Sequence, residues 1–141
     1  MPLILDTGPV YASLDRSDPH HLACRSLIET SDETLVIPAP VLVEVDAWIQ
    51  ERLDPGVLPA LLADIEAGAY VVENLHPSDY ARVRQICERR AGAGIGFVDA
   101  AVLAIVERLD EPKLATLDRL HFGAVHPRHI DALKLLPARI T

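Results

Sequence analysis

Leu3-Ile4-Leu5-Asp6-Thr7-Gly8-Pro9, near the N-terminus, is the stretch that decides the fold. Its three consecutive apolar residues predict a short strand that is buried on both faces. Pro9 suits the first turn of a helix that follows this strand. Asp6 therefore stands where a strand ends and a helix begins. In open parallel sheets ligands bind beyond the carboxyl ends of the strands, so Asp6 is the first candidate functional residue.

The same change from strand to helix recurs along the chain. Short apolar segments predict further strands at residues 35–37, 70–72, 114–117 and 133–136. Asp18-Pro19 predicts the start of one helix, with Asp18 as its N-cap. A 3.6-residue apolar period predicts further helices over residues 41–53, 58–65, 77–90 and 98–109. A turn with Gly92, Gly94 and Gly96 precedes the last of these helices. This alternation predicts one α/β domain over residues 1–141, a three-layer sandwich with a central, mostly parallel sheet.

Length and composition fit a packed domain of this kind. The chain has 141 residues, of which 50% are hydrophobic and only 4% aromatic. Its apolar runs are too short for the roughly 20 residues that cross a bilayer, and no secretory signal is readable, so we expect a cytoplasmic protein. Cys24 and Cys87 lack CxxC spacing and are expected to be buried thiols rather than a disulfide or a zinc site.

The charge of the chain argues against general attraction to nucleic acid. Thirteen Lys and Arg stand against 21 Asp and Glu, which gives a formal net charge of −8. An acidic protein repels a polyanion over most of its surface. A role in nucleic-acid chemistry must then rest on a local site and a bound cation, with a few arginines contacting phosphate.

Four carboxylates are placed to meet at one edge of the predicted sheet. Asp6 and Asp118 follow strands, while Glu44 and Asp99 lie in early turns of helices. At a separation of about 5 Å, each ionised pair would repel by about 3 kcal/mol at an effective dielectric constant near 20. A cation must lie among them, and oxygen ligands favour Mg²⁺ or Mn²⁺ over zinc. Such an ion acidifies a bound water and stabilises charge on a phosphoryl oxygen, which is the chemistry of phosphodiester hydrolysis.

Each carboxylate taken alone has an ordinary structural explanation. Asp6 could cap a helix, and Asp99 could be a first-turn acid that interacts favourably with the helix dipole. Asp118 could be a turn residue. Glu44 is harder to explain in this way, because its apolar neighbours predict a mostly buried helix, where an unpaired carboxylate is costly. The joint occurrence of the four favours a metal site.

These residues resemble the motifs of the PIN domain and, within that family, of the VapC-type toxins of bacterial toxin–antitoxin pairs. The resemblance covers nearly the whole chain, and its four motifs occur in order. They are the strand that ends in Asp6-Thr7, Val41-Leu42-Val43-Glu44-Val45, Gly96-Phe97-Val98-Asp99-Ala100-Ala101, and Leu114-Ala115-Thr116-Leu117-Asp118. Each motif alone is weak, whereas four in order at suitable spacings are specific.

The resemblance implies a mechanism and partners. Asp6, Glu44, Asp99 and Asp118 would hold one or two Mg²⁺ or Mn²⁺ ions, with Thr7 and Thr116 supporting them by hydrogen bonds. The activity would be that of an endoribonuclease acting on tRNA or rRNA, with products that carry a 5′-phosphate and a 3′-hydroxyl. Homodimerisation is implied as well, as is inhibition by a cognate antitoxin whose tail occupies the groove at the site.

The chain departs from the family pattern after Thr116. His121 precedes Phe122, whereas the usual form has an acidic residue and places the Phe one position earlier. This puts an additional carboxylate in doubt, and His121 is expected to be a surface histidine, with phosphate contact as the alternative. His126 and His129 have no evident third partner for a metal. Trp48 falls on one apolar stripe with Val41 and Val45, so it is expected in the core or in a dimer interface, with contact to an antitoxin as the alternative.

Three other functions match parts of the sequence. Asp6-Thr7-Gly8 also matches the Asp-Thr-Gly signature of aspartic proteases, but that fold has few helices. A phosphatase that forms an aspartyl-phosphate needs a second Asp where Gly8 stands. A non-catalytic RNA- or protein-binding module of the same fold is the main alternative, and equal RNA affinity with and without Mg²⁺, without cleavage, would favour it.

Overall fold

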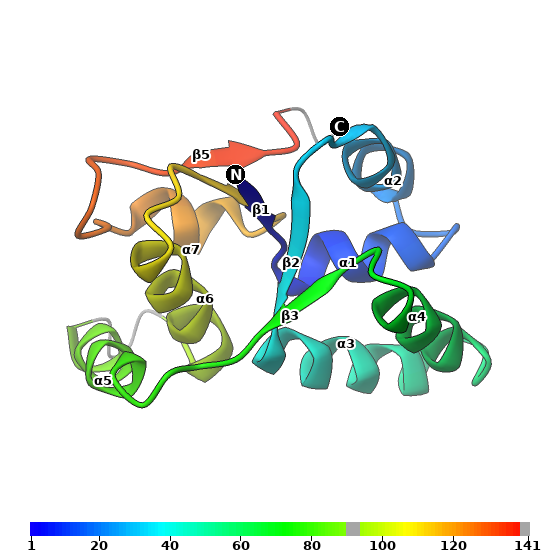
Figure 1. The fold of residues 1–141 in the computed structure, drawn as a ribbon, viewed down its shortest axis with the longest axis horizontal. Helices are drawn as coiled ribbons and strands as arrows, with labels where there is room; N and C mark the ends of the chain where they lie inside the picture. The colour runs from blue at the N-terminus through cyan, green and yellow to red at the C-terminus, as the bar shows by residue number, and fades with distance from the viewer. Residues whose placement is uncertain (90–93, 139–141) are drawn as a thin grey trace.

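In a computed structural model, which describes residues 1–89 and 94–138, parallel strands form the centre of the molecule (Figure 1). They are β1 (Pro2–Ile4), β2 (Thr34–Pro38), β3 (Val71–Glu73), β4 (Lys113–Ala115) and β5 (Lys134–Leu136). One ladder has the order β1-β2-β3 and a second joins β4 to β5. An isolated parallel bridge between Leu5 and Ala115 connects the two ladders. The strands therefore follow one another in the order β3-β2-β1-β4-β5, with β1 at the centre.

Helices cover both faces of these strands. They are α1 (Thr7–Leu14), α2 (His21–Thr30), α3 (Ala39–Arg52), α4 (Val57–Glu66), α5 (Asp79–Arg89), α6 (Phe97–Arg108) and α7 (Arg119–Ala124). In the view of Figure 1, α5 and α6 lie to the left of the strands and α1, α2 and α4 to the right. Helix α3 contacts both α1 and α6. The predicted α/β arrangement of a parallel sheet between helices is confirmed. Among the residues described, no helix has the length and apolar character needed to cross a membrane.

The core is centred on β1 and α6. Ile4 and Leu5 are fully buried, and every residue from Ala100 to Val106 is buried as well. The sequence predicted a single apolar stripe on this helix, but α6 is enclosed on all sides. Its alanines allow neighbouring elements to approach closely, and the burial of residues 100–106 directly after Asp99 fixes the position of this carboxylate.

Several predicted boundaries needed correction. Asp18 is not an N-cap, because α2 begins at His21 and the Asp18 side chain instead accepts a hydrogen bond from the backbone of His20 at 2.8 Å. The fourth strand ends at Ala115 rather than at Leu117. Arg90, the expected last residue of the fifth helix, and Gly92 lie outside the described residues. Cys24 is buried as expected, but Cys87 is only half-buried.

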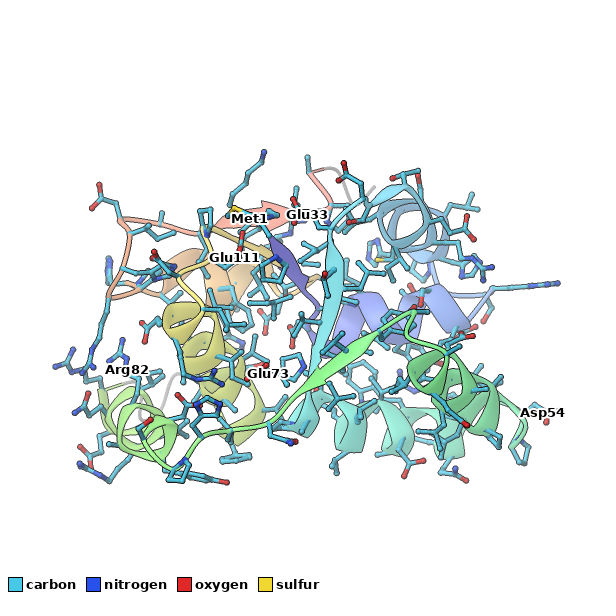
Figure 2. All side chains as sticks on the ribbon, in the orientation of Figure 1. Met1, Glu33, Asp54, Glu73, Arg82 and Glu111 are labelled. Atoms are coloured by element: carbon cyan, nitrogen blue, oxygen red, sulfur yellow. The ribbon has the colours of Figure 1, made fainter. Side chains whose placement is uncertain are left out.

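Ion pairs join the elements around the core, and several of their members are labelled in Figure 2. Arg82 of α5 donates two hydrogen bonds to Glu107 of α6, at 2.7 and 2.8 Å. Lys113 contacts the fully buried Glu111 at 2.6 Å and Glu33 at 2.8 Å. These pairs fix α5 against α6 and β4 against the start of β2, away from the four carboxylates.

Candidate active site

The four predicted carboxylates line one cleft of about 400 Å³. Asp6 directly follows the β1 segment, and Asp118 precedes α7. Asp99 lies in the first turn of α6, and Glu44 in the second turn of α3. The structure thus brings together residues from four separate parts of the chain at the carboxyl ends of the central strands, where the sequence predicted them.

Asp6 is the most deeply placed of the four, with only 5% of its surface exposed. Burial raises the pKa of its carboxyl from 3.8 to about 7, and the negative charges of Asp99 and Glu44 add to this increase. Hydrogen bonds from the Thr116 hydroxyl and the Thr7 backbone oppose the increase in pKa. An acid in this environment is stabilised in its charged form by a cation placed close to it.

Thr116 connects two of the carboxylates. Its hydroxyl donates to Asp6 Oδ2 at 2.8 Å and accepts from the backbone N–H of Asp118 at 3.0 Å. Thr116 is itself fully buried, and its backbone N–H donates to the carbonyl of Leu136 in β5. This fixed hydroxyl sets the position of Asp118 relative to Asp6.

Asp99, Asp118 and His121 form a compact group in which one ligand atom from each residue lies within 4.8 Å of the others. Asp118 caps α7, accepting the His121 backbone N–H at 2.9 Å, and its other oxygen lies 2.7 Å from Nδ1 of the His121 ring. The same nitrogen lies 3.9 Å from Asp99 Oδ2. Burial and the charge of Asp118 raise the pKa of Asp99, and His121 opposes this effect. The expectation that His121 is a plain surface histidine is wrong, and its place three residues after Asp118 is the signal that could have found it.

Two glycines allow the close packing that this cleft requires. A Cβ on Gly8 would lie 3.2 Å from the side chain of Leu117, a tight contact, so glycine lets α1 start beside the end of β4 without a shift of Leu117. Gly94 has a φ of 80°, and a Cβ there would lie 3.3 Å from His121 Nε2. The Gly in Asp6-Thr7-Gly8 therefore has a packing explanation in this fold.

The residues present fit a bound cation. Thr7 lines the cleft beside Asp6, and its buried hydroxyl has no hydrogen-bond partner within the described ranges 1–89 and 94–138. A buried hydroxyl without a partner is rare and indicates a missing water or ligand. Together with converging carboxylates and one imidazole, this donor set suits Mg²⁺ or Mn²⁺.

The protein family described as the PIN domain matches residues 3–125, which is most of the chain. This chain belongs to the PIN-domain family. The aspartic-protease interpretation of Asp6-Thr7-Gly8 is thereby excluded, because the PIN fold is a parallel sheet between helices.

The similarity to VapC proteins extends over most of this PIN domain. The chain is 29% identical to Ribonuclease VapC26 of Mycobacterium tuberculosis over 125 residues, which are 89% of this chain and 93% of that protein. Two similar solved structures, which show the fold alone, are M. tuberculosis VapC20, a Sarcin-Ricin loop cleaving toxin, and Rickettsia felis VapBC2 bound to a DNA fragment from its promoter. VapC20 has a TM-score of 0.80 and 18% identity, and the match covers 92% of this chain and 98% of that one. VapBC2 has a TM-score of 0.69 and 15% identity, and the match covers 96% of this chain and 98% of that one.

FitAcB of Neisseria gonorrhoeae has a TM-score of 0.60 and 19% identity, with 88% of this chain and 92% of that one covered. The sequence-based resemblance to the VapC-type members of the PIN family is confirmed.

One wall of the PIN cleft is built by a face of α3 that the sequence interpretation assigned wrongly. Glu44, Trp48 and Arg52 are spaced four residues apart and all line the cleft. Trp48 is half-buried and contacts the ring of Tyr11 edge-on at 5.4 Å. It is therefore neither a core residue nor a partner of the buried stripe of this helix, which is Val41, Val45 and Ile49.

The same arrangement corrects the expectation for Glu44, which is half-buried on a helix that buries one narrow stripe only. The guanidinium of Arg52 lies 5.1 Å from the Trp48 ring and 5.4 Å from the Tyr11 ring. Arg52 is the one arginine or lysine among the described residues that line this cleft. Held by two aromatic faces, it supplies positive charge to the cleft that the carboxylates line.

Proposed function

We propose that this PIN-domain protein is a Mg²⁺- or Mn²⁺-dependent endoribonuclease and the toxin of a toxin–antitoxin pair. The observation that carries the proposal is the convergence of Asp6, Glu44, Asp99 and Asp118 on one cleft. The similarity to Ribonuclease VapC26 along most of the chain supports RNA as the substrate. VapC20, whose fold is similar, is a Sarcin-Ricin loop cleaving toxin, which supports a structured RNA of the rRNA or tRNA class.

The four carboxylates would hold the metal, with His121 as a further ligand candidate and Thr7 and Thr116 as supporting hydroxyls. When bound, the ion supplies positive charge for a phosphoryl oxygen and acidifies water. Thr116 holds Asp6 and Asp118 in a fixed relation through its two hydrogen bonds. Such supporting contacts are typically worth 10- to 100-fold in metal affinity or activity.

The face of α3 that carries Glu44 also carries groups that can serve the substrate. Arg52 can donate several hydrogen bonds to phosphate oxygens, as guanidinium groups do. Its contacts with Trp48 and Tyr11 hold it in place before RNA binds. Hydrolysis adds the oxygen of water to phosphorus and releases the 3′ oxygen with a proton, so the products carry a 5′-phosphate and a 3′-hydroxyl.

Two protein partners belong to this proposal. The first is a cognate antitoxin, supported by the similarity to the VapBC2 structure. The second is another copy of the chain, because Val43, Tyr80 and Phe97 are 73%, 53% and 49% exposed and line an apolar groove between α3, α5 and α6. Exposed apolar patches of this kind mark protein interfaces. We expect a homodimer in the cytoplasm, where RNA and antitoxin are made. Light scattering of the wild type and of the Val43→Lys variant measures the oligomeric state.

The main alternative is a PIN module that binds RNA or protein without cutting. The cluster of like charges around the buried Asp6 favours the nuclease, because a binding surface has no need of an ionisable group that is costly without a cation.

The experiment that tests the proposal is incubation of antitoxin-free protein with total cellular RNA in Mg²⁺, in Mn²⁺ and in EDTA, followed by mapping of the cut ends. Discrete, metal-dependent cuts with 5′-phosphate ends are expected. Cuts that end in a 2′,3′-cyclic phosphate would contradict the hydrolytic scheme, because the RNA's own hydroxyl would then be the attacking group.

A further inference from the structure

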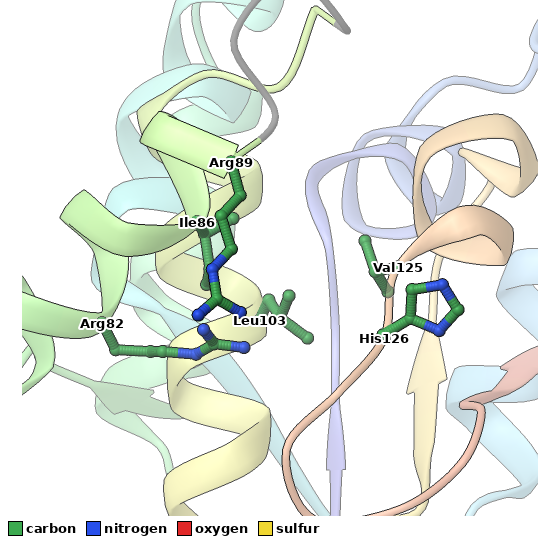
Figure 3. A pocket seen from close by; sticks show the side chains of 6 residues that line it. All are labelled: Arg82, Ile86, Arg89, Leu103, Val125 and His126. Atoms are coloured by element: carbon green, nitrogen blue, oxygen red, sulfur yellow. The ribbon is translucent and has the colours of Figure 1, made fainter.

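A second pocket, outside the carboxylate cleft, lies between α5, α6 and the segment that follows α7. It has a volume of about 210 Å³ and is lined by Arg82, Ile86, Arg89, Leu103, Val125 and His126. In Figure 3, Arg82 and Arg89 reach from α5 toward Leu103, and His126 lies across the opening. The pocket thus combines an apolar floor with a rim of two guanidinium groups and an imidazole.

The arginines of α5 differ in their ion-pair partners. Arg84 of the same helix is paired with Glu88 at 2.9 Å, and Arg82 is paired with Glu107. Arg89, by contrast, makes no hydrogen bond or ion pair with the part of the chain that the structure describes. Glu107 balances the charge of Arg82, so Arg89 is the rim arginine whose charge an anion bound in the pocket would balance.

The carboxyl groups that could neutralise the pocket are already engaged. Glu107 accepts both hydrogen bonds of Arg82 and, in addition, the backbone N–H of Arg128 at 2.9 Å. Glu88 is turned to Arg84 on the exposed side of α5. Within residues 1–89 and 94–138, no carboxyl group therefore neutralises the charge of Arg89.

The pocket and the carboxylate cleft share two walls. Leu103 follows Asp99 by four residues, so it lies on the same face of α6, about 6 Å farther along the helix axis. On the opposite wall, α7 runs from Asp118, which lines the cleft, to Val125, which lines the pocket. A single extended strand that leaves the cleft past α7 would next meet this pocket.

We propose that this pocket binds a phosphate of the RNA strand next to the cut site, with Arg89 as the principal contact. The proposal rests on the proposed nuclease function. Arginine suits phosphate oxygens, and contacts of this kind position a strand without reading its sequence. The pocket therefore supplies affinity and register to a surface that otherwise repels RNA.

The test compares Arg89→Glu with Arg84→Glu, which makes the same charge change on the same helix outside the pocket. Both are placed in an Asp6→Asn background with Mg²⁺, and binding of a short fluorescein-labelled single-stranded RNA is measured at several salt concentrations. Arg89→Glu should weaken binding by about tenfold and reduce the slope of log K against log salt by about 0.7 for each lost contact. In the cleaving protein it should raise KM and leave kcat nearly unchanged. Arg84→Glu should have little effect on either.

Equal losses in the two variants, or no loss in either, would overturn the proposal. Polyglutamate that competes as strongly as RNA in an Arg89-dependent manner would assign the pocket to an acidic protein segment instead. If Arg89→Glu binds RNA normally while the wild type cuts RNA with Mg²⁺, only the pocket assignment falls. If the wild type neither binds nor cuts RNA, the proposed nuclease function falls first.

Discussion

The hydroxyl of Thr116 donates a hydrogen bond of 2.8 Å to Asp6 Oδ2, joining the end of β4 to the end of β1 across 110 residues of sequence. The hydroxyl oxygen of Thr116 also accepts a hydrogen bond from the backbone N–H of Asp118. One buried side chain thus orients a carboxylate and the turn that carries a second one. The geometry of the proposed metal site depends on this contact as much as on the acids themselves.

Replacing Thr116 by valine should reduce RNA cleavage by about 10- to 100-fold. Valine keeps the shape of the side chain but removes the donor to Asp6 and the acceptor for Asp118. Titration of activity with Mg²⁺ measures the effect, and the midpoint should move to higher metal concentration. Thr116→Ser, which keeps the hydroxyl, should recover most of the activity. Equal activity in the valine and serine variants would show that the hydroxyl has no such role.

Asp6→Asn should stabilise the metal-free protein at neutral pH. The pKa of Asp6 is about 7 in the folded chain against an ordinary 3.8, so the folded state holds the proton more tightly than the unfolded state. The contribution of Asp6 to stability is therefore greatest below pH 4. As the pH rises from 4 to 7, the free energy of unfolding falls by about 1.4 kcal/mol for each pH unit. The amide does not ionise and avoids this loss.

Urea unfolding in EDTA at pH 5 and pH 8 measures this difference. The advantage of Asp6→Asn over the wild type should be larger at pH 8, and added Mn²⁺ should stabilise the wild type much more than the variant. An advantage that does not change with pH would contradict the buried, ionisable Asp6.

His121→Gln should lower the activity with Mn²⁺ more than the activity with Mg²⁺. Imidazole nitrogen suits transition metals, whereas Mg²⁺ prefers oxygen, and the His121 ring lies beside Asp118 and Asp99. The ratio of the two rates measures the effect, with His76→Gln as a control, because His76 pairs with Glu73 away from the cleft. An unchanged ratio would remove His121 from the set of metal ligands.

Lys113→Met should destabilise the protein by about 3–5 kcal/mol, because it leaves the fully buried Glu111 without its partner. Urea unfolding measures the loss. Arg25→Met, which removes a partner from the exposed pair with Glu29, should have little effect, because water and salt screen exposed ion pairs. The double variant Lys113→Met/Glu111→Gln should recover part of the loss. Similar effects of the two single variants would contradict the burial of Glu111.

The strands and the four acids were predictable because both depend on local signals. An apolar run that stops at Asp6 or shortly before Asp118 marks the carboxyl end of a strand, and parallel strands place these ends at one edge. The end of α4 has a local signal as well. Gly68 follows α4 with a φ of 88°, and the N–H of Ala69 donates to the carbonyl of Asp64, the pattern that ends a helix.

The contacts between side chains were not predictable in the same way. Helix α7 has six residues, too few to show a period, so the place of His121 beside Asp118 was missed. Trp48 could be counted on either of two neighbouring stripes of α3, and only the packing of Val45 and Ile49 shows which stripe is buried. The pocket at Arg89 depends on the distance between α5 and the segment after α7. The apolar periodicity of the sequence does not predict this distance.

The most direct test of the proposed site is the cleavage rate of four single variants measured side by side with the wild type in Mg²⁺. They are Asp6→Asn, Glu44→Gln, Asp99→Asn and Asp118→Asn, with Glu51→Gln on the exposed face of α3 as the matched control. One shared metal site predicts that all four lose most of the activity while folding normally, and that Glu51→Gln cuts as the wild type does. Full activity in Asp6→Asn or Asp99→Asn would contradict the assignment of this cleft as the active site.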